Sequence, residues 1–121
     1  MSLRAIELKA FVPAKDFALS RRFYADLGFV ETSEAGGVAY FHHGDVSFLL
    51  QDFYDRALAE NLMLHLLVED VSAWHDRLVG ANLGARYGIK HSEIVQQPWR
   101  MRDFTLHDPS GVLWRIAENA K

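Results

Sequence analysis

Apolar and polar residues alternate over residues 3–12, which places every second side chain on one side of an extended segment. A period of two is typical of a half-buried strand. Asp16 then stands where a helix N-cap is expected, and the next apolar residues recur at helical spacing until Gly28. The pattern therefore predicts a strand over 3–12 and an amphipathic helix over 16–27.

Three short apolar runs follow this helix, at residues 29–33, 38–41 and 46–50. Gly36-Gly37 and Gly44-Asp45 separate them, and such pairs favour tight turns. The first part of the chain thus predicts the order β-α-β-β-β.

The same pattern begins again at residues 62–68, where apolar residues alternate with others, and Asp70 stands before a second helical run. A weaker strand over 85–89, an irregular stretch around Pro98 and strands over 102–107 and 112–117 complete the repeat, with a turn over 108–111. Each unit would leave one sheet face unburied, so the two must pack together or against a partner. We expect one domain of two modules, about 1–58 and about 59–121, with 53–61 as a linker or a short helical turn.

Composition narrows the function classes. The 121 residues are 50% hydrophobic and 24% charged, which is typical of one globular domain. The net charge of −3 and the absence of Lys/Arg clusters argue against a nucleic-acid partner. The apolar runs are too short to span a bilayer, and the first residues lack a secretion signal. The chain has no cysteine, which fits a cytoplasmic protein.

Three pieces of the sequence resemble the vicinal-oxygen-chelate superfamily, which includes glyoxalase I, bleomycin-resistance proteins and extradiol dioxygenases. They are the first cap and helix from Asp16 to Phe29, the second cap Val68-Glu69-Asp70-Val71, and the turn and strand from Asp108 to Trp114. The resemblance implies an α+β fold of two tandem βαβββ modules with curved mixed sheets. It also implies a cavity on the concave side and a homodimer. A ferredoxin-like sandwich is the rival fold, but it normally lacks three consecutive strands after each helix.

The resemblance also implies where a metal would be bound. The family's metal enzymes place ligands at positions that fall here on Lys9, Met63 and Arg115, with an optional fourth on Phe48. Ammonium and guanidinium groups have no free lone pair, a thioether is a poor ligand for hard ions, and a phenyl ring cannot ligate. The sequence therefore predicts no metal cofactor, and this departure argues against metal-dependent lyase, thiol-transferase and dioxygenase activities.

The altered positions still predict a cavity. Strand parity places eight residues opposite the helix-packing face: Lys9, Phe11, Phe48, Met63, His65, Leu67, Leu113 and Arg115. Two cations in an apolar wall favour an anionic or aromatic small organic ligand. The alternative is that acidic neighbours such as Glu7, Glu69 or Asp103 neutralise Lys9 and Arg115. Side chains such as Phe48 and Met63 are more often plain packing than ligand contacts.

Histidine and tryptophan supply the remaining candidates. His65 shares a face with Met63 and is the candidate hydrogen-bond donor or general base, against the alternative of a rim histidine without chemistry. Trp99 lies in the irregular segment 91–100 and is a candidate for stacking on a ligand. Parity places Trp114 toward the helices, in the core, and His75 on the solvent side of its helix.

These residues favour a metal-independent protein of the bleomycin-resistance branch that sequesters an antibiotic or a metabolite in a bacterial cytoplasm. The alternative is an enzyme of the same fold, lyase, isomerase or dioxygenase-like, that works through acid–base residues of the cavity. A third interpretation is an interaction domain whose cavity is filled. The ligand itself and the pairing of the modules, within one chain or between two, are left open by the sequence.

Overall fold

The computed structural model describes residues 1–120 and contains two four-stranded mixed sheets with four helices. Sheet A has the order β1-β4-β3-β2 and sheet B the order β5-β8-β7-β6. The strands are β1 (Phe11–Pro13), β2 (Val30–Ala35), β3 (Val38–His43), β4 (Val46–Gln51), β5 (Met63–Leu67), β6 (Val95–Gln97), β7 (Met101–His107) and β8 (Leu113–Asn119). The helices are α1 (Phe17–Leu27), α2 (Arg56–Asn61), α3 (Val71–Gly80) and α4 (Leu83–Tyr87). The predicted fold class is confirmed.

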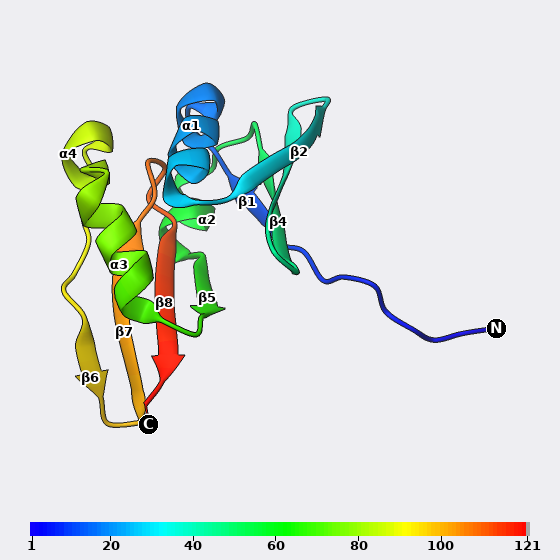
Figure 1. Cartoon of the computed structure of the whole chain (residues 1–121). Helices are drawn as coiled ribbons and strands as arrows, with labels where there is room; N and C mark the ends of the chain where they lie inside the picture. Colours follow the sequence, from blue (N-terminus) through cyan, green and yellow to red (C-terminus); the bar gives the residue numbers. More distant parts are fainter. Residues whose placement is uncertain (121) are drawn as a thin grey trace.

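Both sheets are built on the same plan. The first strand of each, β1 or β5, pairs in parallel with the last, β4 or β8, and the other neighbours are antiparallel. Figure 1 shows α1 beside the upper sheet and α3 beside the lower one. The segment that the sequence left open as a linker or a helical turn forms α2, capped by the Asp55 side chain.

One core joins the two sheets. Phe41 and Phe48 of sheet A and Trp114 and Ile116 of sheet B belong to the same buried cluster. The ring of Tyr24, from α1, lies 4.8 Å from that of Phe48 and 5.6 Å from that of Trp114. Each sheet therefore turns one face, its inner face, toward this core and the other, its open face, away from it.

A buried polar group lies at the centre of the core. The Tyr24 hydroxyl donates to Asp108 Oδ2 at 2.5 Å and accepts from Trp114 Nε1 at 2.8 Å. The other carboxylate oxygen of Asp108 accepts from the backbone N–H groups of Ser110 and Val112. The network links α1 to the turn before β8, so it ties the two halves of the chain together.

The predicted strand over 3–12 is wrong in length, because β1 covers only Phe11–Pro13. In the register of β1 with β4, Phe11 pairs with Leu49, so Leu8 would lie opposite Val46, the first residue of β4. Residues 1–7 therefore have no strand of their own sheet to pair with. We call residues 1–10 the arm.

Three further expectations are wrong. The weak strand predicted over 85–89 is the helix α4, which lies between left-handed Asn82 and Gly88. The predicted irregular stretch contains the short strand β6, which pairs with β7. His75 is buried and not on the solvent side, because its ring packs 5.0 Å from that of Phe104. In residues 1–120, no helix is both long and apolar enough to cross a bilayer.

Candidate functional site

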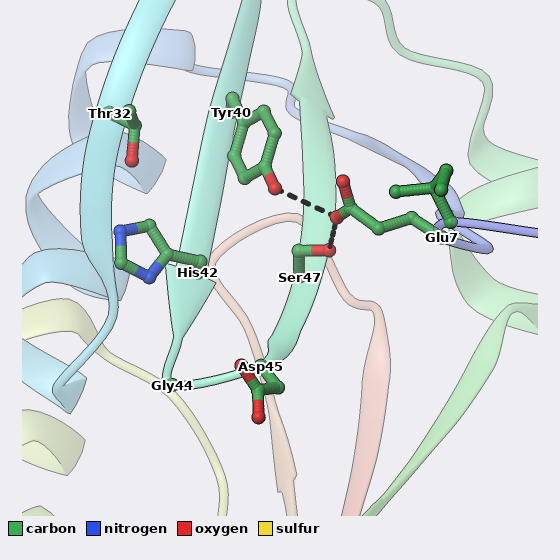
Figure 2. A pocket seen from close by; sticks show the side chains of 8 residues that line it. Glu7, Thr32, Tyr40, His42, Gly44, Asp45 and Ser47 are labelled. Atoms are coloured by element: carbon green, nitrogen blue, oxygen red, sulfur yellow. Dashed lines mark hydrogen bonds between the residues drawn. The ribbon is translucent and has the colours of Figure 1, made fainter.

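The open face of sheet A carries polar and aromatic side chains around a hollow of about 520 Å³. Tyr40 and His42 alternate along β3, and Ser47 lies opposite His42 on β4. Because their neighbours Phe41 and Phe48 point into the core, strand parity turns these three side chains away from it. Figure 2 shows them around the hollow, together with Thr32 of β2 and Glu7 of the arm.

Glu7 organises this hollow. Its Oε2 accepts hydrogen bonds from the Tyr40 hydroxyl at 2.7 Å and the Ser47 hydroxyl at 2.5 Å (Figure 2). Lys9 Nζ lies 3.3 Å from Glu7 Oε1 and 5.1 Å from the centre of the Tyr40 ring. The hydrogen bond from Ser47, then that from Tyr40, lowers the pKa of the Glu7 carboxyl below its ordinary value. An ionised Glu7 thus holds both hydroxyls, and its contacts weaken as the pH falls through its pKa.

The open face of sheet B carries a second set of groups. His65 of β5 lies opposite Arg115 of β8 in the sheet register, so their side chains share a face. Arg115 Nη1 donates to Asp103 Oδ2 at 2.8 Å, and Gln97 Nε2 donates to Asp103 Oδ1 at 2.9 Å. Asp103 is buried, whereas His65 and the neighbouring Met63 are exposed.

A groove of about 430 Å³ lies between the two sheets, between the first residues of β4 and the length of β5 from Leu64 to Leu67. Its lining is mostly apolar and comes from the arm, β4, β5 and the core: Leu8, Ala10, Phe29, Val46, Ser47, Phe48, Leu64, His65, Leu66, Leu67 and Trp114. Ser47 and His65 are the polar side chains on its rim. Through Ser47 and His65, the groove includes one side chain from the open face of each sheet.

The structure divides the predicted site residues between the sheets. Lys9 and Phe11 belong to the sheet A side, where Phe11 pairs with Leu49, the neighbour of Tyr40. Met63, His65 and Arg115 lie on the open face of sheet B. These five residues do not line one hollow within a single chain.

The predicted orientation of Phe48 is wrong. Phe48 is 3% exposed, and its ring stacks on that of Phe41 at 5.5 Å in the core. Sheet register explains the error: Phe11 pairs with Leu49, so Leu49 and not Phe48 shares the face of Phe11. Trp99 is exposed in the turn between β6 and β7, and Trp114 lies in the core as predicted.

Both predicted cations have acidic partners. Lys9 pairs with Glu7 and Arg115 with Asp103, which are two of the neutralising partners considered from the sequence. Both pairs keep some exposure, with about a quarter of each cationic side chain open to solvent. A ligand would therefore meet polar hydrogen-bonding pairs and not two free positive charges.

Sequence reasoning missed Tyr40, His42 and Ser47, and it considered Glu7 only as an acidic partner of Lys9. The signal was present in the alternation of residues 38–43 and 46–51, which places Tyr40, His42 and Ser47 on one face once their neighbours are assigned to the core. The role of Glu7 had no such signal, because it depends on how the arm crosses β4.

The four positions at which the family's metal enzymes hold an ion do not fit one here. Lys9 and Arg115 are engaged in ion pairs, Met63 offers only a thioether, and Phe48 is buried in the core. Within residues 1–120, no group of three or more His, Cys, Asp or Glu side chains is arranged to hold a metal.

The sequence profile of the Glyoxalase/Bleomycin resistance protein/Dioxygenase superfamily matches residues 8–116. The chain belongs to this superfamily. Comparison with curated proteins gives no significant match.

Solved structures of the glyoxalase and bleomycin-resistance superfamily share the fold at low sequence identity. A bleomycin-binding protein from Streptomyces verticillus complexed with copper(II)-bleomycin is 22% identical, with a TM-score of 0.73 over 98% of this chain and 99% of that one. The antibiotic-binding protein TnmS3 from a Streptomyces species is 22% identical, with a TM-score of 0.76 over 99% of both chains. A lactoylglutathione lyase from Agrobacterium tumefaciens is 16% identical, with a TM-score of 0.70 over 95% of this chain and 94% of that one. The superfamily fold is thus shared with binding proteins and with an enzyme.

Proposed function

We propose that this protein binds a small organic molecule without a metal ion and sequesters it, as a homodimer in a bacterial cytoplasm. The observation that carries the proposal is the hydroxyl pair Tyr40 and Ser47, held by Glu7 beside a hollow of about 520 Å³. A hollow of this size with a few fixed polar groups is typical of small-molecule sites. Solved relatives that bind bleomycin or another antibiotic support the same class of ligand.

The proposed ligand has an aromatic part and several hydrogen-bonding groups. Tyr40 and His42 offer ring edges and faces on sheet A, with their ring centres 6.3 Å apart. On sheet B, His65 and the remaining N–H groups of Arg115 can donate hydrogen bonds. Because Lys9 and Arg115 are paired with carboxylates, a purely anionic ligand would have to displace Glu7 or Asp103. These pairs favour an aromatic ligand over a simple anion.

Metal independence rests on the side chains at the family's ligand positions, none of which suits a hard divalent ion. The family's metal-dependent reactions are for this reason not the activity we propose. The competing activity is acid–base catalysis by His65, which lies exposed beside Arg115 on sheet B.

Titration with metal-free bleomycin and a panel of planar aromatic antibiotics, in buffer with EDTA, tests the proposal. The three tryptophans provide a fluorescence readout, with calorimetry as the second measurement. We expect saturable binding that EDTA does not change. Tyr40→Phe should weaken this binding about 5-fold, because the variant loses one hydrogen bond worth about 1 kcal/mol. Tyr54→Phe, which lies outside both hollows, should bind as the wild type does.

Three outcomes would contradict the proposal. They are the lack of saturable binding across the panel, binding that EDTA abolishes, and turnover of a bound compound that falls about 100-fold or more in His65→Ala. The last outcome would favour the acid–base enzyme.

A further inference from the structure

A hollow of about 280 Å³ lies beside the tryptophan of α3, on the side of sheet A that faces the helices. It is formed by the last residues of α1, the end of β3 and one side of α3: Leu27, Gly28, His43, Ala73, Trp74 and Arg77. We call this hollow the α3 cleft. None of its residues lines the hollow around Tyr40 and Glu7 or the groove between the sheets. The α3 cleft is therefore separate from the candidate site described above.

Aromatic contacts hold the wall of the α3 cleft in place. The half-buried ring of Trp74 lies 4.9 Å from that of His43 and 5.9 Å from that of the buried Phe29. His43 Nδ1 lies 2.9 Å from the carbonyl oxygen of Gly28, and because a carbonyl oxygen only accepts, Nδ1 is the donor. The indole and the imidazole are thus oriented by the protein itself, which lowers the entropy cost of binding a flat molecule against them.

Arg77 supplies a positive charge at the rim of the α3 cleft. Its Nε donates to the backbone carbonyl oxygen of Asp26 at 2.9 Å, and no carboxylate among residues 1–120 forms an ion pair with it. The Asp26 carboxylate is engaged by Arg86 at 2.7 Å and by the Tyr87 hydroxyl at 2.6 Å. Two guanidinium groups therefore meet at one carboxylate. The terminal N–H groups of Arg77 are suited to bind a second carboxylate.

The opposite charge lies at the other end of the Trp74 ring. A second hollow, of about 340 Å³, shares His43, Ala73 and Trp74 with the α3 cleft and has Glu69 and Asp70 in its wall. The surface around Trp74 is therefore negative toward the start of α3 and positive toward Arg77. An anion is repelled at the first end and attracted at the second, so the charges fix the direction in which it would bind.

We propose that the α3 cleft is a second binding site, and that its ligand is a small planar aromatic carboxylate. The aromatic ring would lie against Trp74 and Leu27, and the carboxylate would accept hydrogen bonds from Arg77. An apolar cavity of about 150 Å³ is sufficient for benzene, so a cleft of about 280 Å³ is sufficient for one or two fused rings. This inference goes beyond the proposed function, because it uses none of the residues that would bind the sequestered molecule.

Other classes of small ligand fit the α3 cleft less well. An organic cation would meet the guanidinium of Arg77 at the rim. Inorganic phosphate or sulfate would leave the apolar lining of Leu27, Ala73 and Trp74 without a contact. An aromatic carboxylate uses both the apolar lining and the positive charge.

The first test is a titration with 2-naphthoate, followed by the indole N–H signals of the three tryptophans in nitrogen-15 NMR spectra. The Trp74→Phe variant assigns its own signal. We expect a saturable shift of the Trp74 signal with a Kd below about 1 mM, a reasonable affinity for a ligand of this size. Trp114 is buried in the core and Trp99 lies in the turn between β6 and β7, so their signals should stay in place.

The second test separates the carboxylate from the ring. The uncharged amide of 2-naphthoate should bind the wild type about 10-fold more weakly, because it loses a charge-assisted hydrogen bond with Arg77. Arg77→Gln should weaken binding of 2-naphthoate by the same factor and leave the two compounds nearly equal. Arg77→Lys, which keeps the charge, should restore part of the difference.

The matched control is Arg56→Gln. Arg56 is an exposed arginine of α2 outside the α3 cleft, and this variant should bind both compounds as the wild type does. The thermal unfolding midpoint shows whether each variant is folded. The comparison of the acid with its amide uses the wild type alone, so it decides the matter even if Arg77→Gln fails to fold.

Three results would overturn the second site. They are the lack of a saturable Trp74 shift up to about 10 mM 2-naphthoate, equal affinity of the wild type for the acid and the amide, and unchanged affinity in a folded Arg77→Gln. Tyr40→Phe should leave 2-naphthoate binding unchanged, and Arg77→Gln should leave antibiotic binding unchanged. Failure of the second site and failure of the proposed function are therefore separate outcomes.

Discussion

Tyr24 contacts groups from both halves of the protein at the centre of the core. Its hydroxyl lies between a carboxylate and an indole N–H, and its ring contacts aromatic rings from both sheets. Burial first, and then the negative charge of Asp108, raises the pKa of Tyr24 well above 10. Burial likewise raises the pKa of Asp108, although the hydrogen bond from Tyr24 and backbone N–H groups oppose it. The hydrogen bond from the Tyr24 hydroxyl thus offsets part of the free-energy cost of burying the Asp108 carboxylate.

Removal of the Tyr24 hydroxyl should destabilise the folded protein. We expect Tyr24→Phe to lower the free energy of unfolding by about 1–3 kcal/mol, because Asp108 loses a donor and Trp114 loses its acceptor. Urea unfolding followed by tryptophan fluorescence measures the change. Tyr40→Phe removes a hydroxyl on the open face and should change stability by less than about 0.5 kcal/mol.

The pH dependence of the stability difference between the wild type and Tyr24→Phe tests whether the Tyr24 hydroxyl causes it. A raised pKa in the folded state means that the wild type loses stability as the pH rises above 10, where the unfolded tyrosine ionises. Tyr24→Phe lacks this loss, so the advantage of the wild type should shrink at alkaline pH. A stability difference between the two proteins that stays constant up to pH 11 would contradict its assignment to the buried Tyr24 hydroxyl.

At the scale of elements, two aspartates begin the long helices in the same way. Asp16 Oδ1 accepts from Leu19 N at 3.1 Å, and Asp70 Oδ1 accepts from Ala73 N at 3.2 Å. Both contacts were predictable from the sequence, because a cap and its helix depend on residues within one turn.

We expect Asp70→Ala to lower the free energy of unfolding by about 1 kcal/mol, through loss of the cap and of a negative charge at the N-terminus of α3. Thermal and urea unfolding measure the effect. Asp76→Ala, an exposed site inside α3, removes the same charge without a cap and should have a smaller effect. Equal losses in the two variants would argue against capping.

Elements that depend on distant partners were less predictable. Residues 3–10 have the alternation of a strand, but a strand also needs a neighbour, and β4 begins only at Val46. Residues 83–87 form α4 where a strand was expected, and contacts across the fold hold them: Arg86 and Tyr87 both donate to Asp26 of α1. The local sequence pattern indicates neither the missing partner strand of residues 3–10 nor the contacts of α4 with Asp26.

The candidate site shows the same limit. Parity correctly grouped Met63, His65 and Arg115 on one face, since each strand fixes its own alternation. It failed for Phe48, whose face depends on the register between β1 and β4. The pairing of Arg115 with Asp103 required two strands to be aligned, so the sequence offered it only as an alternative.

At the scale of the whole molecule, the proposed homodimer has a thermodynamic consequence. If folding and association are coupled, the unfolding midpoint should rise with protein concentration. We expect an increase of a few degrees between about 1 and 100 µM for the wild type, measured by calorimetry.

The division of the domain into two modules, about 1–58 and about 59–121, stays a prediction from the sequence.

Because the two halves of the chain share a single core, each half depends on the other for its packing. A fragment ending before β5 would keep Tyr24 but lose Asp108 and Trp114, and would expose Phe29 and Phe48 to water. A fragment starting at β5 would retain a carboxylate whose donor is gone. Amide hydrogens of α1 and β8 should accordingly exchange with solvent together, in one cooperative opening, although they lie at opposite ends of the sequence.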